Sequence, residues 1–148
     1  MRPALFKFIV NPPPFAVLSR YTFRPSHTVF IQTDGSFKPQ YSRTAVFINT
    51  HENKEFKLRK AYLDHNDSME SEWCSILDGI QYSIKHKHVC IELENDNQQV
   101  VQSLIERKSP NKQYLTKYYR MIYNEINGLD YFGIRWIPRE FNKADLLL

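Results

Sequence analysis

Short apolar and alternating stretches predict strands in the first third of the chain. Residues 28–33 form an apolar, β-branched run that ends at the Asp-Gly-Ser sequence of residues 34–36, which predicts a strand leading into a turn. Residues 43–50 and 55–63 are short, alternate in polarity and are separated by loops, so they predict a second and a third strand. We therefore expect an antiparallel meander of three strands.

The rest of the chain alternates between helical periodicity and short apolar runs. Apolar residues recur every three or four positions behind Asp67, a residue type that caps helices. The predicted elements are a helix over 67–87, a strand over 89–93, a helix from 96 to 108, a helix over 112–128, a strand over 131–137 and a final short helix. This order predicts an α/β fold with a five-stranded mixed sheet, three antiparallel strands and then two parallel ones, with helices on both faces.

Residues 1–26 differ in composition from the rest of the chain. They contain four basic residues, no acidic residue and three consecutive prolines at 12–14, which do not fit a regular helix or a central strand. We expect an N-terminal basic, Pro-containing extension over 1–26 that packs on the domain or touches nucleic acid, and one domain over 27–148. A transit peptide is the alternative, although prolines disfavour its amphipathic helix.

Composition and charge narrow the class of protein. The chain has 148 residues, of which 42% are hydrophobic, and no apolar run approaches the roughly 20 residues that span a bilayer. We expect no membrane partner and an intracellular, cytoplasmic location, with organellar targeting left open. The net charge of +4 favours a polyanionic partner. Cys74 and Cys90 lack zinc-ligand spacing and sit among apolar neighbours, so we expect them to be buried hydrophobes.

Four acidic residues lie at or near the ends of predicted elements. Asp34 and Asp96 end the first and fourth strands, Glu72 lies in the first helical turn, and Asp145 follows the fifth strand. Taken singly, each acid has an ordinary structural explanation. Asp34 could belong to an Asp-Gly turn, and Glu72 could complement the helix dipole. Asp96 could cap a helix, and Asp145 could be a solvated surface charge. Gathered together they would repel, and a hard dication such as Mg²⁺, which prefers carboxylate oxygens, would remove that repulsion.

Each of the four acids lies in a sequence segment that resembles a known motif. Residues 31–37 (IQTDGSF), 71–80 (SEWCSILDGI), 94–101 (ENDNQQVV) and 136–146 (WIPREFNKADL) follow one another in order and fall on the expected strands and helices. They resemble the motifs of the type 1 ribonuclease H family, within the ribonuclease H-like superfamily. The resemblance covers residues 28–147 and implies a ribonuclease H-like fold.

The resemblance also implies a function and a set of site residues. It implies a metal-dependent endonuclease, a hydrolase that cuts the RNA strand of an RNA–DNA hybrid and leaves 5′-phosphate ends. Two Mg²⁺ ions, with Mn²⁺ as a possible substitute, would be bound by the catalytic residues Asp34, Glu72, Asp96 and Asp145. Reading the 2′-hydroxyl would distinguish RNA from DNA. The positions matching substrate contacts are Gly35, Ser36, Ser68, Asn97, Gln98 and Asn142.

Departures from the family pattern leave alternatives open. Glu70 competes with Glu72 for the helix position, and the spacing between Asn142 and Asp145 is one residue shorter than usual, which leaves the phase of Asp145 open by about 100°. No histidine follows His88, and Pro-Arg-Glu stands before the last acid. Without the basic handle of some members, the substrate grip would fall to Lys85, Lys87, Arg107, Lys108, Lys112 and Lys117. The alternative functions are a catalytically weak or inactive nucleic-acid or protein-interaction module, and a nuclease of the superfamily with another substrate.

Overall fold

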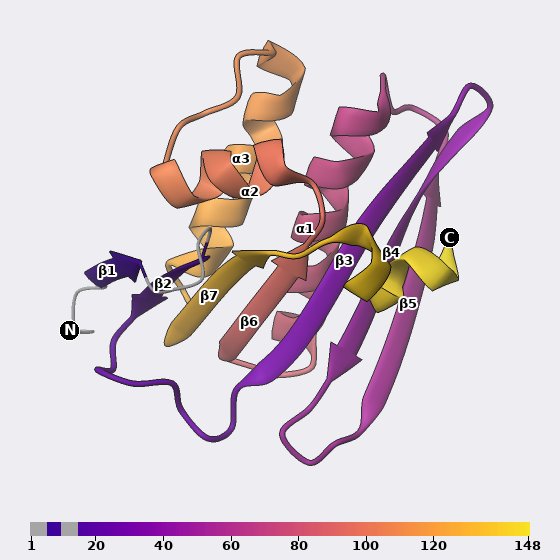
Figure 1. The fold of residues 1–148 in the computed structure, drawn as a ribbon. Coiled ribbons are helices and arrows are strands. Elements are labelled where there is room, and N and C mark those ends of the chain that lie inside the picture. Colours follow the sequence, from indigo (N-terminus) through magenta and orange to yellow (C-terminus); the bar gives the residue numbers. More distant parts are fainter. Residues whose placement is uncertain (1–5, 10–14) are drawn as a thin grey trace.

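One mixed sheet positions the acidic residues, with its strands in the order β1-β2-β7-β6-β3-β4-β5 (Figure 1). The computed structural model describes residues 6–9 and 15–148. The strands are β1 (Phe6–Ile9), β2 (Phe15–Ser19), β3 (Val29–Lys38), β4 (Tyr41–Asn49), β5 (Glu55–Tyr62), β6 (Cys90–Asn95) and β7 (Tyr131–Trp136). β3, β4 and β5 form the predicted antiparallel meander, and β6 pairs parallel with both β3 and β7. The predicted α/β fold is confirmed.

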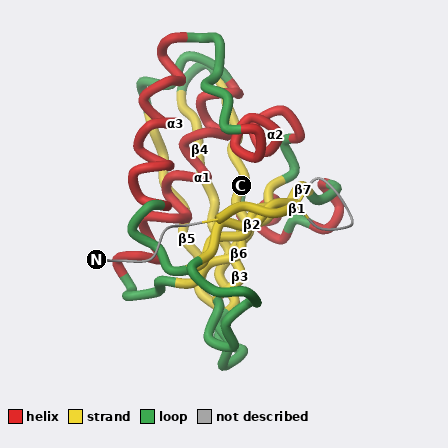
Figure 2. Tube along the Cα trace, turned by 90° about the vertical axis from the view of Figure 1, so that its left-hand side faces the viewer, coloured by secondary structure: helices red, strands yellow, loops and turns green. Residues whose placement is uncertain are grey.

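Three α-helices pack against one face of the sheet, and a 3₁₀ turn covers the other. The helical elements are α1 (Ser68–Lys85), α2 (Gln98–Glu106), α3 (Gln113–Ile126), and the 3₁₀ turns η1 (Arg139–Phe141) and η2 (Lys143–Leu147). α1 and α3 run along the same side of the strands (Figure 2), and the apolar sides of all three α-helices share the main core with the sheet. On the opposite face Ala144 of η2 packs against Ala45 and Phe47 of β4. No helix in the described ranges is long and apolar enough to cross a membrane.

The start of the described chain adds two strands to the five that were predicted. β2 pairs antiparallel with β7, and β1 pairs with β2. Ala16 and Leu18 of β2 enter the main core, whereas Phe15 and Val17 pack on the opposite face. A five-residue run that is apolar on both faces carries no periodicity, so the sequence pattern did not reveal it. The boundary expected after residue 26 falls between β2 and β3, and the three prolines lie outside the described residues.

The predicted turn at residues 34–36 is wrong, because β3 runs straight through it. Asp34 pairs with Ala45 and Gly35 with Thr44 on β4, and Gly35 does not have a positive φ. The turn tendency of Asp-Gly is local, whereas continued pairing with β4 supplies hydrogen bonds along the whole strand. Gly35 serves a different purpose: a Cβ there would lie 2.4 Å from the Ser71 carbonyl carbon, so the glycine lets α1 rest directly on the strand.

Candidate metal centre

Three carboxylates from three different elements converge at one edge of the parallel part of the sheet. Asp34 comes from β3, Glu72 from the first turns of α1, and Asp96 from the residue that follows β6. One carboxylate oxygen from each lies within 4.8 Å of the others, and Asp34 and Glu72 are buried. Oxygen donors at this spacing are those that a hard dication such as Mg²⁺ prefers.

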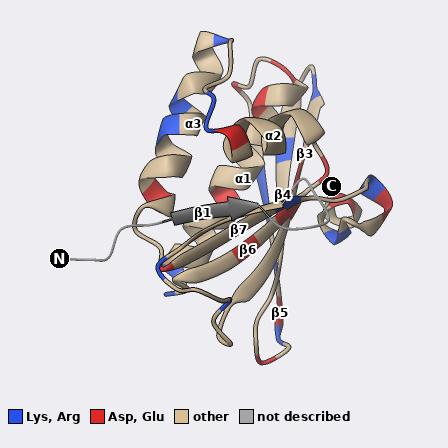
Figure 3. Cartoon of the chain, turned by 60° about the vertical axis from the view of Figure 1, so that its left-hand side comes forward, with Lys and Arg blue, Asp and Glu red and all other residues tan. Residues whose placement is uncertain are grey.

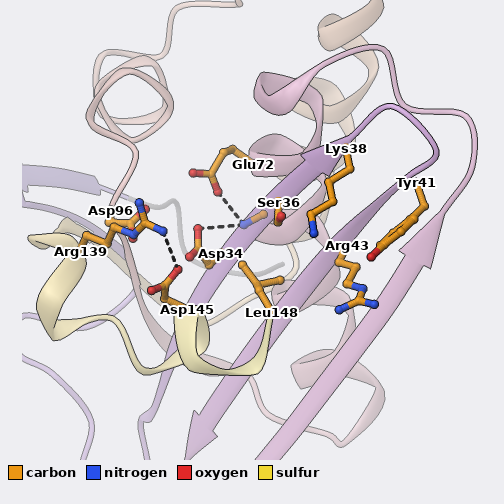
Figure 4. A pocket seen from close by; sticks show the side chains of 11 residues that line it. Asp34, Ser36, Lys38, Tyr41, Arg43, Glu72, Asp96, Arg139, Asp145 and Leu148 are labelled. Carbon is orange, nitrogen blue, oxygen red and sulfur yellow. Dashed lines mark hydrogen bonds and ion pairs between the residues drawn. The ribbon is translucent and has the colours of Figure 1, made fainter.

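The backbone N–H of Gly35 holds two of these carboxylates together. It donates to Oδ1 of Asp34 at 2.9 Å and to Oε1 of Glu72 at 2.7 Å, as the dashed lines in Figure 4 show. The close approach of α1 to β3 at Gly35 makes this shared bond possible, because it brings Glu72 within reach of the strand. The local packing of helix on strand therefore sets the geometry of the acidic pair.

Asp96 is held from behind by a buried asparagine. The Asn142 side chain, 3% exposed, donates through Nδ2 to the Thr33 carbonyl at 2.9 Å and to Oδ2 of Asp96 at 3.3 Å. Nε1 of Trp136 donates to the Asp96 carbonyl at 3.0 Å. These bonds tie the residue after β6 to β3, to β7 and to the segment before η2. Asn142 thus positions a carboxylate rather than lying open to a ligand.

Burial raises the pKa values of all three acids, and the charges of neighbouring carboxylates add to this effect. Burial, followed by the charges of Glu72 and Asp96, raises the pKa of Asp34 to about 9. Burial and then the Asp96 charge raise the pKa of Glu72 to about 7, although the Gly35 N–H opposes this shift. Burial also raises the pKa of Asp96. The cluster is thus strained when fully ionised, and the residues present fit a bound cation that would neutralise them.

Asp145 lies beside this group but is not one of the three that converge. Its carboxylate lines the same cleft and also raises the pKa of Asp34. Oδ1 of Asp145 pairs with the exposed guanidinium of Arg139 at 3.4 Å (Figure 4). The 3₁₀ turn η2 carries it, and Oδ1 of Asn142 caps this turn by accepting from the Ala144 N–H. This tight turn thus places Asp145 beside the three converging carboxylates.

Glu70, the rival of Glu72, faces a different environment. It accepts hydrogen bonds from the Tyr118 hydroxyl at 2.7 Å and from the Asn66 backbone N–H at 2.7 Å. Although burial alone would raise its pKa, these bonds leave the pKa of Glu70 lowered, so it stays ionised. Glu70 therefore links α1 to α3, and Glu72 is the helix acid that joins Asp34 and Asp96 in the carboxylate cluster.

The predicted substrate-contact residues are divided between the cleft and its surroundings. Gly35 and Ser36 line the cleft. Asn97 caps α2 through its side chain and lowers the pKa of Glu72 by a side-chain hydrogen bond. Ser68 and Gln98 are the exposed first residues of α1 and α2 and lie outside the cleft lining.

The cleft has a basic half that the sequence pattern did not reveal. Its volume is about 450 Å³, and the carboxylates occupy one end of it. Lys38, Tyr41 and Arg43 line the other end, on the hairpin of β3 and β4 (Figure 4). The sequence pattern did not indicate these residues, because a turn at residues 34–36 would end the strand before Lys38. In the structure β3 continues to Lys38, which therefore lies on the same face as Asp34.

Comparisons with known proteins agree with the geometry. A family model described as reverse transcriptase-like matches residues 32–147. No curated protein matches the chain. Among solved structures, RNase H1 of the archaeon Halobacterium salinarum superposes with a TM-score of 0.74 at 18% identity, covering 81% of this chain and 93% of that one.

Two further structures give similar values. The N-terminal RNase H domain of a Mycobacterium tuberculosis protein superposes with a TM-score of 0.71 at 19% identity, over 82% of this chain and 90% of that one. LC11-RNase H1, isolated from compost by a metagenomic approach and solved in complex with an RNA/DNA hybrid, gives 0.67 at 18% identity, over 80% and 92%. At these identities the structures show the fold, and the family model adds the relationship in sequence. The chain belongs to the reverse transcriptase-like family of RNase H-like proteins.

Proposed function

We propose that the protein is a metal-dependent endonuclease that hydrolyses the RNA strand of RNA–DNA hybrids. The observation that carries the proposal is the convergence of Asp34, Glu72 and Asp96 within 4.8 Å on an RNase H-like fold. The hybrid bound to the similar LC11-RNase H1 supports the choice of substrate. The products expected from this chemistry carry 5′-phosphate and 3′-hydroxyl ends.

Carboxylate oxygens of Asp34, Glu72, Asp96 and Asp145 would hold two Mg²⁺ ions, with Mn²⁺ as a substitute. Bound there, the ions would supply a water of lowered pKa and would stabilise the charge that develops on the leaving oxygen. Asp34 is central to the set, because Glu72, Asp96 and Asp145 all act on its pKa. It is therefore the residue whose loss should matter most.

The other residues of the site orient these carboxylates or face the substrate. The Gly35 N–H and the Asn142 amide hold Asp34, Glu72 and Asp96 in place before substrate arrives. Ser36 in the cleft and Asn97 beside it supply polar groups near the acids, and Ser68 and Gln98 offer contacts at the two helix N-termini.

Arg139 supplies a permanent positive charge at the mouth of the cleft. Its pKa is raised, first by the hydrogen bond to Asp145 and also by the charges of Asp34 and Asp96, so it stays protonated and does not relay protons. We infer that it attracts a phosphate oxygen, and that its bond to Asp145 loosens as the substrate binds. No histidine follows His88 in the sequence, so the residues around Arg139 and Asp145 include no imidazole that could move a proton.

One observation favours a second candidate, a binding module with weak or no activity. Asp145 pairs with Arg139 and is not among the three carboxylates that converge. If this pair persisted with metal and hybrid bound, the fourth acid would be withheld from the metal. The protein would then bind a hybrid without cutting it.

A substrate panel separates these candidates. RNA–DNA hybrid, duplex DNA and duplex RNA, each end-labelled, are incubated with the full chain in Mg²⁺, Mn²⁺ or EDTA. The proposal predicts metal-dependent cleavage confined to the RNA strand of the hybrid. Loss of this cleavage in Asp34→Asn would assign the activity to the carboxylate site. Cleavage of another duplex would indicate a different substrate, and binding without cleavage under all conditions would indicate the module.

A further inference from the structure

The face of the sheet that carries Asp34 continues into a basic surface. Side chains alternate along a strand, so Asp34, Ser36 and Lys38 of β3 share one face. Directly opposite on β4, Arg43 pairs with Ser36 and Tyr41 pairs with Lys38. All five residues line the same cleft (Figure 4). One face of the hairpin thus leads from the acids to two cations.

These two cations are not engaged by acidic partners. Within the described ranges, neither Lys38 nor Arg43 forms an ion pair with a carboxylate. The guanidinium of Arg43 instead lies over the Tyr41 ring, 4.8 Å from its centroid, which supports the side chain without neutralising it. An unneutralised pair of cations inside a cleft attracts anions.

The cations on the helical side are placed differently. Lysine and arginine residues are spread over several elements (Figure 3), so net charge alone does not mark a binding path. Lys112 pairs with Asp67 at 3.2 Å and Lys117 with Glu70 at 3.9 Å. Lys85 lies in the last turn of α1, at the end opposite Glu72. The sequence predicted that these three lysines help to hold the substrate, but none of them lines the cleft that holds the acids.

We propose that Lys38 and Arg43 bind backbone phosphates of the substrate strand to one side of the cleavage position, with Tyr41 orienting Arg43. The inference rests on the proposed function, because it takes the scissile phosphate to lie at the acids. Four residues of β-strand span roughly 14 Å, so Lys38 reaches a phosphate a few nucleotides from the one at Asp34. The substrate strand would follow the β3–β4 hairpin away from the metal centre.

Charge-matched double variants of the full chain test this path. Lys38→Gln/Arg43→Gln and the control Lys54→Gln/Arg120→Gln each remove one lysine and one arginine charge, and the exposed control sites lie outside the cleft. Each pair is combined with Asp34→Asn, and binding to a labelled hybrid is followed in Mg²⁺ as salt is raised. We expect the first pair to weaken binding about tenfold and to reduce the log–log salt slope by about 2, and the control to change neither appreciably.

Kinetics and substrate length distinguish grip from folding. In the chain with Asp34 intact, Lys38→Gln/Arg43→Gln should raise KM and leave kcat within about twofold. The exchanged pair Lys38→Arg/Arg43→Lys keeps both charges and should retain affinity. Binding is also measured with hybrids whose RNA is shortened stepwise from one end or from the other. Shortening from one end should abolish the difference in affinity between the variant and the parent, and shortening from the other end should not.

The outcomes separate this inference from the proposed function. If the parent cleaves the hybrid but Lys38→Gln/Arg43→Gln binds as the parent does, or loses no more affinity than the control, the path is wrong and the function stands. If the parent does not cleave, the function fails, and the salt slopes still report whether these residues contact phosphate. Equal dependence on both RNA ends would also overturn a one-sided path.

Discussion

The backbone N–H of Gly35 lies 2.7 Å from Oε1 of Glu72 and joins a strand residue to a helix residue 37 positions away. The same N–H donates to the carboxylate of Asp34, so one donor holds two acids whose charges repel. The contact depends on a glycine, because the α1 backbone occupies the space in which a Cβ would lie. The close packing of α1 on β3 at Gly35 therefore also sets the positions of the Asp34 and Glu72 carboxylates.

Gly35→Ala should disturb the site through that packing. The new Cβ would meet backbone atoms of Ser71 and Glu72 at 2.4–2.7 Å, and helix backbone cannot move aside as a flexible side chain can. We expect a loss of about 1–3 kcal/mol in the free energy of unfolding, measured in urea. Metal affinity or hybrid cleavage should fall roughly 10- to 100-fold, because an outer hydrogen bond to two ligands is displaced.

Gly128→Ala is the matched control for this substitution. A Cβ at Gly128 would meet the Glu125 carbonyl oxygen at 3.4 Å, an ordinary contact, and its φ is not positive. The control should keep activity. If Gly35→Ala were equally harmless, the close approach of α1 to β3 would not set the geometry of the acids.

The stability of the metal-free protein should fall as pH rises. The folded-state pKa of Asp34 is about 9, well above its ordinary value of 3.8, so the folded protein holds a proton that the unfolded chain releases. This group therefore favours folding least above pH 9, and its contribution is lost progressively between about pH 4 and 9. The melting temperature in EDTA should decline over this range, and the decline should be shallower in Asp34→Asn.

Added Mg²⁺ should reverse this decline in the parent protein. A cation that binds the folded state alone stabilises it, most strongly at the pH where the carboxylates ionise readily. Asp34→Asn should show a higher melting temperature in EDTA, a smaller response to Mg²⁺ and no turnover. A parent protein whose melting temperature ignores both pH and Mg²⁺ would contradict the clustered-acid account.

The two neighbouring acids of α1 should respond oppositely to the same chemical change. Glu72→Gln removes a carboxylate from the cluster proposed to hold the metal ions, so turnover should be lost while the melting temperature in EDTA is kept or raised. Glu70→Gln removes the charge that strengthens the bonds from Tyr118 and Asn66, and it turns one acceptor oxygen into an amide NH₂, to which Tyr118 could only accept. We expect that variant to lose about 1–3 kcal/mol of stability and to keep its activity. Urea titration and hybrid cleavage on both proteins check the assignment, and the opposite pattern would transfer the metal role to Glu70.

Asp145→Asn tests whether the fourth acid takes part. The substitution keeps the shape of the side chain but removes the charge that pairs with Arg139. If Asp145 joins the metal centre during catalysis, hybrid cleavage in Mg²⁺ should fall roughly tenfold or more with stability almost unchanged. Unchanged cleavage would show that three carboxylates suffice.

The order of elements could be predicted from the sequence because it follows from periodicity. The meander, the three helices and the two parallel strands each contain enough apolar repeats to show their type, and Asp67 caps α1 as expected. β2 was missed, because its five residues are buried on both faces and show no period. Cys74 and Cys90 are free and buried, as their apolar neighbours indicated.

The site was partly predictable, and the parts missed have a common cause. The order of the family motifs predicted Asp34, Glu72 and Asp96 as site residues, and their carboxylates converge in the fold. The basic half of the cleft was missed, because a local turn signal at residues 34–36 interrupted the alternation that places Lys38 on the face of Asp34. The role of Asn142 behind Asp96, and the choice between Glu70 and Glu72, depend on tertiary contacts that sequence spacing does not contain.

The measurement that tests the central claim most directly is a Mg²⁺ titration of hybrid cleavage by the parent chain and by Asp34→Asn. The RNA strand carries the label, and the ends of its fragments are identified. We predict that the parent cuts the RNA only when Mg²⁺ is present, leaving 5′-phosphates, and that Asp34→Asn binds the hybrid without cutting it. Cleavage in EDTA, or equal cleavage by the two proteins, would contradict the assignment of a metal-dependent nuclease site to Asp34, Glu72 and Asp96.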